Sequence, residues 1–174
     1  MPNVEVIYGK IDSYKRSWCI SVTERNFTAL GLIKDATSHC NGVYIPATNE
    51  DIKSFDKREI EGSGYKYERV LVQREFCDDL FKDDEVYTYI SIDNNLSNIC
   101  PLIESYIDVV ISGCLDYNYE FAEEFIKNTS NWNSNWINDR KNILYSNPKR
   151  LDDYYDDIDE LLKKNSLLSL RKEF

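Results

Sequence analysis

Two hydrophobic patterns divide the chain, with β-like patterns in the first part and helix-spaced apolar positions in the second. Residues 10–22 alternate over part of their length and are rich in aromatic and β-branched residues, which is typical of a strand. Residues 27–33 predict a second strand, 34–38 a turn, and 41–46 a further strand that ends at a proline. The pattern therefore indicates mainly β-structure in this part of the chain.

A short helix is predicted next, because residues 48–51 (Thr-Asn-Glu-Asp) carry an N-capping signal. Ile52 and Phe55 are spaced to lie on one side of that helix. We expect the helix to end at Arg58 or Glu59 and to pack through its two apolar residues against neighbouring strands.

Two more strands are predicted at residues 65–73 and 85–92, and helical spacing follows Pro101, which suits a first helical turn. Residues 120–127 predict a second short helix. Residues 151–162 predict a final amphipathic helix, whose acid-rich start and basic end complement the helix dipole.

This order of elements, strands first and helices later, predicts an α+β fold built on a barrel-like or strongly curved sheet. A chain of 174 residues fits one domain, and neither an internal repeat nor a low-complexity linker divides it. We therefore expect a single domain over residues 1–174, with the sheet in about 1–100 and a helical part in about 101–170.

The net charge of −10 argues against a surface that binds nucleic-acid phosphates or anionic membranes, because both need clustered Lys and Arg. No apolar run approaches the ~20 residues of a membrane span. The start of the chain, Met-Pro-Asn-Val-Glu, carries no visible secretory signal. We therefore expect a cytoplasmic protein that binds neither nucleic acid nor membranes.

The five cysteines are widely spaced and form no C-x-x-C pair, and His39 is the only histidine. Although His39 adjoins Cys40, no second ligand pair lies at zinc spacing. Cys19 and Cys40 show no histidine arrangement that suits a thiol nucleophile. We expect buried reduced thiols, with neither a metal nor a cofactor.

Three segments, residues 41–46 (NGVYIP), 51–59 (DIKSFDKRE) and 64–72 (GYKYERVLV), form the order strand, helix, strand. Together they resemble the gamma-glutamylcyclotransferase-like family, whose signature is an Asn-Gly-Val strand, a short helix ending Leu-Asp-x-x-Glu, and a Tyr-x-Arg-Val-x-Val strand. Residues 13–18 (SYKRSW) and 29–35 (ALGLIKD) are similar to two other strands of that family. With helical pieces further on, the resemblance covers roughly residues 10–145.

The resemblance implies the family's small mixed β-barrel with flanking helices and a helical C-terminal extension. It also implies the family's reaction, in which the α-amino group of a γ-glutamyl amine or peptide attacks its own γ-carbonyl, giving 5-oxoproline and a free amine. The family's general acid/base is the last Glu of the short helix, which is Glu59 here. One carboxylate can take the proton from the attacking ammonium and then give one to the leaving amine. Tyr65, Tyr14 and Trp18 are expected near the substrate.

One departure from the family concerns its opening Tyr-Gly-Ser loop, whose backbone amides hold the substrate's carboxylate and carbonyl oxygen. In this chain the only Tyr-Gly pair is Tyr8-Gly9, which lacks the Ser and precedes Tyr14 by a few residues. Two interpretations stay open. Tyr8 and Gly9 either contribute to substrate binding or belong to an incoming strand.

Glu59 likewise has two interpretations. As a catalytic residue it should be substantially buried beside a cavity, with Tyr65 and an aromatic residue of 14–18 nearby. As a structural residue it should be a solvated carboxylate at the helix end, paired with Lys57 or Arg58. Asp56, one helical turn earlier, is either the second half of a carboxylate pair or a structural acid.

Two alternatives to an enzyme follow. A catalytically degenerate relative would bind a small molecule or a protein partner through the same pocket. A structural protein would use the helix at residues 151–162 as an interface, unless that helix packs on its own domain. The adjacent residues Asp139 and Arg140 are expected to form a local ion pair.

Overall fold

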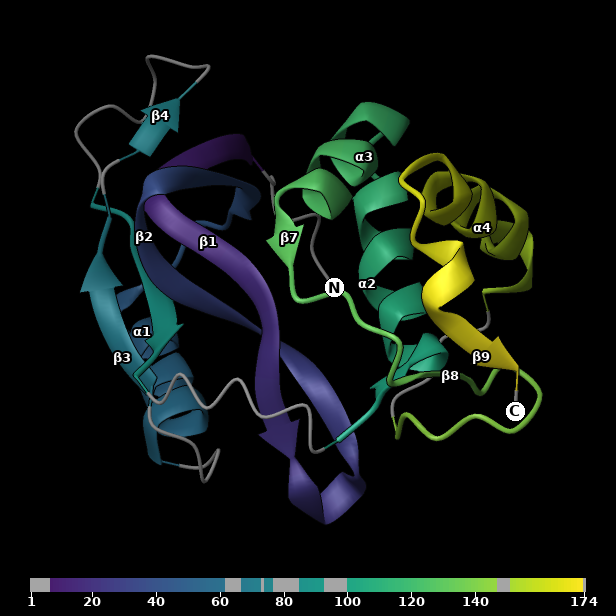
Figure 1. The fold of residues 1–174 in the computed structure, drawn as a ribbon. Helices are drawn as coiled ribbons and strands as arrows, with labels where there is room; N and C mark the ends of the chain where they lie inside the picture. Colours follow the sequence, from purple (N-terminus) through teal and green to yellow (C-terminus); the bar gives the residue numbers. More distant parts are fainter. Residues whose placement is uncertain are drawn as a thin grey trace. The chain divides into compact units, whose positions relative to one another are not determined.

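The computed structural model describes residues 7–61, 67–72, 74–76, 85–92, 100–146 and 151–173. The chain forms two compact units, one made of residues 1–16 and 31–94 and the other of residues 17–30 and 95–174. Strands β1 (Ile7–Val22) and β2 (Phe27–Tyr44) each contribute to both units and are joined by the 3-10 turn η1 (Thr23–Arg25) (Figure 1).

Strand β2 is continuous over 18 residues, so the turn predicted at residues 34–38 is wrong. In the described sheet, β2 pairs with β1, and β1 pairs with β4 (Arg74–Phe76). Asp35 accepts hydrogen bonds from the backbone N–H and the hydroxyl of Thr37. These polar residues resemble a turn signal, but an edge strand can present them to solvent without reversing the chain.

The first unit also contains α1 (Asn49–Asp56), followed by a two-stranded antiparallel sheet of β3 (Tyr67–Leu71) and β5 (Tyr87–Ser91). Its core contains a small apolar cluster made of Tyr14, Val72 and Ile90, with partly buried neighbours Ile11, Leu32, Val70 and Val86. The predicted helix and both predicted strands are therefore confirmed over the residues that are described.

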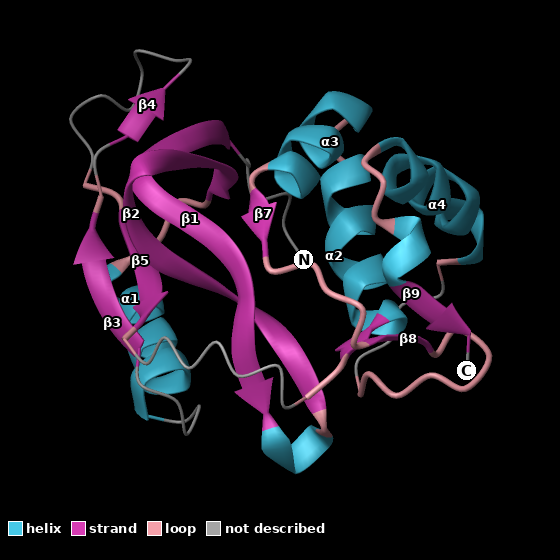
Figure 2. Ribbon diagram, in the orientation of Figure 1, coloured by secondary structure: helices cyan, strands magenta, loops and turns pink. Residues whose placement is uncertain are grey.

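The second unit is mainly helical (Figure 2), with α2 (Glu104–Leu115), α3 (Tyr119–Lys127) and α4 (Tyr155–Lys164) packing on one another. A parallel sheet joins β6 (Leu102–Ile103), β8 (Trp136–Asn138) and β9 (Arg171–Glu173). Shorter elements are β7 (Thr129–Ser130), η4 (Asp152–Tyr154) and η5 (Leu168–Leu170). Helix α2 begins three residues beyond Pro101, because Leu102 and Ile103 first pair with β8.

All three tryptophans belong to the second unit, where Trp18 and Trp136 are buried in the core and Trp132 is partly buried. The ring of Trp132 lies 5.2 Å from that of Trp18 and 5.3 Å from that of Trp136, measured between centroids. Among the described residues, the indole N–H groups of Trp18 and Trp132 have no hydrogen-bond acceptor.

The apolar stripe of α4 faces this unit's own interior, since Ile158, Leu161 and Leu162 are fully buried. The hypothesis that this stripe forms an interface with another protein is therefore wrong. Cys19, Cys40, Cys100 and Cys114 are buried, and burial raises the pKa of the Cys19 and Cys40 thiols. Cys77 lies outside the described residues.

The α+β class is confirmed, with four helices and three sheets in the described part of the chain. Those sheets do not form a closed barrel over residues that can be described, so the barrel stays a prediction. None of the described helices combines the length and apolar character needed to cross a membrane.

Candidate functional site

Helix α1 begins with the predicted cap and ends in an unusual turn. The Thr48 hydroxyl accepts a hydrogen bond from the Asp51 backbone N–H, and the Asp51 carboxylate accepts one from the Thr48 backbone N–H at 2.9 Å. After Asp56 the chain widens into a π turn (Lys57–Glu61), which contains Glu59. Such turns are rare and are often found at functional sites.

The Glu59 side chain is 29% exposed. Both Nε and Nη2 of Arg58 lie 2.7 Å from its Oε1. The Glu59 side chain is thus partly buried, beside the exposed guanidinium of Arg58, and its place at a cavity stays a prediction. The contact with Arg58 is the one expected if Glu59 is a structural residue at the end of the helix.

Asp56 is held by two strands. Its Oδ2 lies 2.5 Å from Nη1 of Arg69, and its Oδ1 accepts a hydrogen bond of 2.8 Å from the Tyr89 hydroxyl. Arg69 and Tyr89 are direct cross-strand neighbours in the β3–β5 pair, and the Arg69 guanidinium also lies over the Tyr87 ring. Asp56 thus serves as a structural acid that fastens the end of α1 to this sheet.

The other residues predicted near the substrate lie in several parts of the described structure. Tyr14 is buried in the apolar cluster of the first unit, and its backbone oxygen accepts a hydrogen bond from the Cys40 thiol. Trp18 is only 2% exposed and contacts Trp132 and Tyr106 in the second unit. Tyr65 lies outside the described residues.

Tyr8 and Gly9 lie inside strand β1, where Gly9 is opposite Phe76 of β4. A Cβ added at Gly9 would lie 1.8 Å from the Tyr44 ring, so any larger residue there would require the ring to move. The Tyr44 hydroxyl donates a hydrogen bond of 2.7 Å to the backbone oxygen of Lys10. Tyr8 and Gly9 are therefore part of a strand, as the second of their two interpretations expects.

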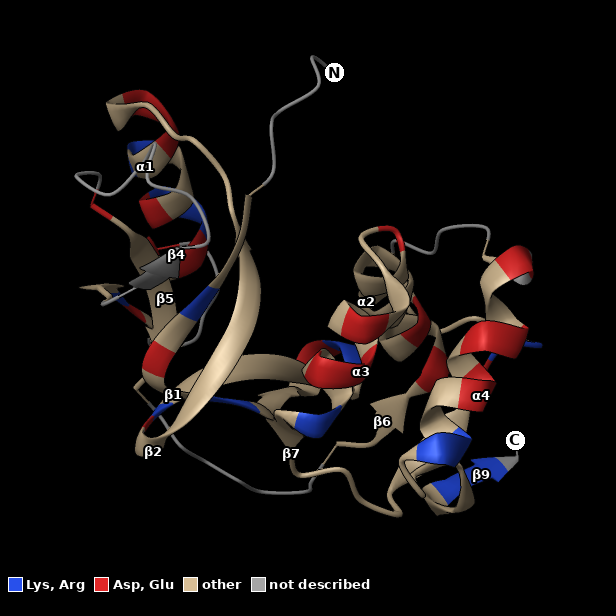
Figure 3. Cartoon of the chain, turned by 90° about the horizontal axis from the view of Figure 1, so that it is seen from above, with Lys and Arg blue, Asp and Glu red and all other residues tan. Residues whose placement is uncertain are grey.

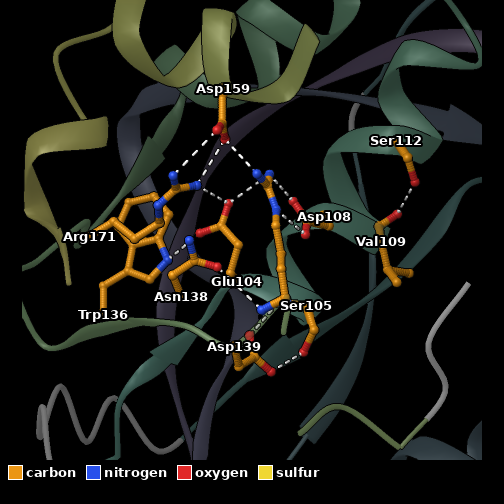
Figure 4. Close-up of polar contacts among 11 residues, drawn as sticks. Glu104, Ser105, Asp108, Val109, Ser112, Trp136, Asn138, Asp139, Asp159 and Arg171 are labelled. Atoms are coloured by element: carbon orange, nitrogen blue, oxygen red, sulfur yellow. Dashed lines mark hydrogen bonds and ion pairs between the residues drawn. The ribbon is translucent and has the colours of Figure 1, made fainter. Parts of the chain in front are cut away.

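The second unit contains a buried polar cluster that was not predicted from the sequence (Figure 4). It consists of Glu104, Asp108, Asp159, Arg140 and Arg171. Glu104 is fully buried. It accepts hydrogen bonds from Trp136 at 2.8 Å, Arg171 at 3.0 Å and Arg140 at 3.1 Å. Two acids one turn apart in an otherwise apolar helix were the available signal.

The predicted local ion pair of Asp139 with Arg140 is wrong. Arg140 binds Asp108 through two nitrogens, at 2.9 and 2.7 Å. Asp139 instead accepts hydrogen bonds from the backbone N–H and hydroxyl of Ser105 and from the Leu144 backbone. The two adjacent side chains therefore have different partners on α2. Arg140 binds Asp108, 32 residues earlier in the sequence, and Asp139 binds Ser105, 34 residues earlier.

Metal binding has no support in the described residues, where no group of three or more His, Cys, Asp or Glu side chains is arranged to hold an ion. The acids of the cluster are instead occupied by two guanidinium groups.

Comparison with known proteins gives a structural likeness only. No protein-family model matches the chain, and no curated protein matches its sequence. An uncharacterized protein from Homo sapiens is similar in structure, with a TM-score of 0.54 and 13% identity, over 93% of this chain and 86% of that one. A gamma-glutamyl cyclotransferase gives a TM-score of 0.54 and 14% identity, over 91% of this chain and 87% of its own.

At these identities the likeness concerns the fold, and it extends over nearly the whole of each chain. It agrees with the order of strand and helix motifs in the sequence. The chain therefore has the fold of gamma-glutamyl cyclotransferase.

Proposed function

We propose that this protein is a gamma-glutamylcyclotransferase-like enzyme that converts a γ-glutamyl amine or peptide to 5-oxoproline and a free amine. Glu59 is the proposed general acid/base. The observation that carries this proposal is the position of Glu59 in a π turn directly after α1, within a fold like that of gamma-glutamyl cyclotransferase.

In the proposed reaction the substrate's α-amino nitrogen forms a bond to its own γ-carbonyl carbon. Glu59 takes the proton that this nitrogen loses. As the original amide bond breaks, Glu59 returns a proton to the leaving amine, so the carboxylate is regenerated. Arg58 holds the carboxylate in the free protein and must share it with the substrate ammonium.

The remaining assignments stay predictions. They are the binding roles of Tyr65, Tyr14, Trp18, Tyr8 and Gly9, the single domain, and the cytoplasmic location. The ligand expected from them is a small γ-glutamyl compound.

The test is to incubate the protein with γ-glutamyl amino acids and γ-glutamyl amines and to measure 5-oxoproline. Glu59→Gln should lower kcat by ~100-fold or more, as expected for loss of a general acid/base. Glu61→Gln is a matched control in the same π turn and is exposed, so it should leave kcat unchanged. Equal activity in wild type and Glu59→Gln would remove Glu59 from the mechanism.

A second candidate is a catalytically degenerate relative that binds a small molecule or a protein partner. It is favoured by the place of Tyr8 and Gly9 inside β1, with the Tyr44 ring against Gly9. A binder of γ-glutamyl compounds would be stabilised in a thermal-shift assay in proportion to RT ln(1 + [L]/Kd), without release of 5-oxoproline. Product formation in the same sample would eliminate this candidate.

A further inference from the structure

Among the residues that the structure describes, the buried cluster of the second unit carries unequal numbers of opposite charges. Three carboxylates, on Glu104, Asp108 and Asp159, share two guanidinium groups, on Arg140 and Arg171. When all five groups are ionised, one negative charge is in excess. Charge without a counter-ion is costly where water is excluded, so a proton on one carboxylate would remove the excess.

Glu104 is the carboxylate from which solvent is most completely excluded. The Asp159 side chain is 33% exposed, so water can hydrate its charge, and Asp108 receives a two-nitrogen contact from Arg140. Glu104 is fully buried and shares each of its guanidinium partners with another acid.

The cluster joins four parts of this unit. The ionisable groups that face it are Glu104 and Asp108 on α2, Arg140 after β8, Asp159 and Tyr155 on α4, and Arg171 on β9. Asp139 lies next to it but is occupied by Ser105 and Leu144. Figure 3 shows the acidic residues of α2, α3 and α4 and the basic residues of β9.

Strand β9 depends directly on this cluster. Arg171 is its first residue, and it binds Glu104 at 3.0 Å and Asp159 at 2.8 Å. The backbone of β9 continues in register with β8, where Lys172 is opposite Ile137. Ionisation of Glu104 would therefore place a buried negative charge at the point where β9 is fastened, and opening of β9 would let water reach that charge.

We propose that the Glu104 cluster makes the attachment of β9 sensitive to pH. Strand β9 is held firmly when the cluster carries one proton, and it opens more often when all of the cluster's acids are ionised. This property is independent of the proposed reaction, because the residues belong to the second unit and Glu59 belongs to the first.

The balance of burial and charge supports a proton on Glu104. Burial raises the pKa of Glu104 from 4.5 to about 8; Asp108 adds to the rise, and Arg171 and Arg140 oppose it. Burial also raises the pKa of Asp108. The three hydrogen-bond donors to Glu104 and its position in the first turn of α2 favour the ionised form, but they do not outweigh burial.

The sign of the stability effect follows from this rise. The folded protein keeps the proton up to about pH 8, whereas the unfolded chain releases it near pH 4.5. The contribution of Glu104 to stability is therefore complete below about pH 4.5, falls as the pH rises towards 8, and levels off above that value.

Trp136 provides a direct probe, because its indole N–H donates to Oε2 of Glu104. We expect the NMR resonance of this N–H in the wild-type protein to shift with pH, with a midpoint near 8. The indole resonances of Trp18 and Trp132, which have no acceptor among the described residues, should stay constant over the same range. Above the midpoint, amide exchange in β9, corrected for its intrinsic pH dependence, should become ~10-fold faster.

Two variants and one control test the assignment. Glu104→Gln should abolish the titration of the Trp136 resonance and the pH dependence of β9 exchange. Asp159→Asn removes the excess charge from the exposed side of the cluster, so it should lower the midpoint of the Trp136 resonance shift. This variant tests the proposal even if Glu104→Gln fails to fold. Glu123→Gln removes a carboxylate that binds Lys127 and Lys164 on the surface, so it should change neither readout.

A Trp136 resonance that stays constant from pH 5 to 10 would contradict the proposal. An Asp159→Asn variant whose Trp136 resonance has the wild-type midpoint would also contradict it. The same holds if amide exchange in β9 does not change over the pH range in which the Trp136 resonance shifts. None of these outcomes depends on whether the protein forms 5-oxoproline.

Discussion

At the scale of single residues, Gly9 is a position where a small substitution should lower stability. An added Cβ would lie 1.8 Å from the Tyr44 ring, which is itself held by a hydrogen bond to Lys10. Gly9→Ala should therefore lower the free energy of unfolding by ~1–3 kcal/mol through overpacking. Urea denaturation followed by circular dichroism measures this change.

Gly42→Ala is the matched control, because an added Cβ at Gly42 meets no atom within 4 Å. It should be neutral or slightly stabilising, since alanine restricts the unfolded chain. A second variant that combines Gly9→Ala with Tyr44→Val should recover part of the loss. If Gly9→Ala unfolds at the wild-type urea concentration, the close packing of Tyr44 is not important for stability.

At the scale of elements, α1 is held by an aspartate at each end. Asp51 completes the N-terminal cap, whereas Asp56 lies at the C-terminal end, where the helix dipole disfavours an acid. Its contact with Arg69 and Tyr89 compensates for that position. Asp56→Asn should therefore loosen the π turn that contains Glu59.

Hydrogen exchange can measure this effect. In Asp56→Asn, amides of residues 57–61 should exchange ~5-fold faster or more, which corresponds to the loss of about 1 kcal/mol of a partly exposed charged hydrogen bond. Asp51→Asn, a chemically identical change in the same helix, should accelerate exchange only in the first turn. Equal patterns in the two variants would show that Asp56 has no local role at the π turn.

The elements that the sequence predicts correctly are those specified by neighbouring residues. The Thr48–Asp51 cap and the apolar spacing of α4 are local signals, and the structure contains both. The turn expected within β2 was wrong, because pairing with β1 decides that segment. The sequence around the π turn carries no signal for it. The residue before the turn, Asp56, is held by Arg69, which lies 13 residues further along the chain.

The candidate site shows the same limit. The motif pointed to Glu59, but its exposure and its contact with Arg58 depend on the path of the π turn. The Glu104 cluster depends on Arg171, 67 residues away, and spacing along the chain cannot predict that partner. Similarity of motif order gave the fold, and long-range contacts decide the details of the site.

At the scale of the whole molecule, neither compact unit is a continuous stretch of sequence. The second unit takes residues 17–30 from the β1–β2 region, and Asn131 donates a hydrogen bond to Ser17, 114 residues earlier. Contacts of such long sequence separation slow folding, because loop closure comes before the contact is made. A fragment that begins at residue 95 would also lack Trp18 and its neighbours, so we expect it not to fold independently.

The three tryptophans give this division an optical consequence. Because Trp18, Trp132 and Trp136 all belong to the second unit, intrinsic tryptophan emission is a signal of that unit alone. Far-ultraviolet circular dichroism reports on helices and strands of both units. If the chain is one domain, the two signals should change at the same denaturant concentration, as coincident probes do in a two-state transition. An emission change separated from the dichroism change would instead reveal two folding units connected by shared strands.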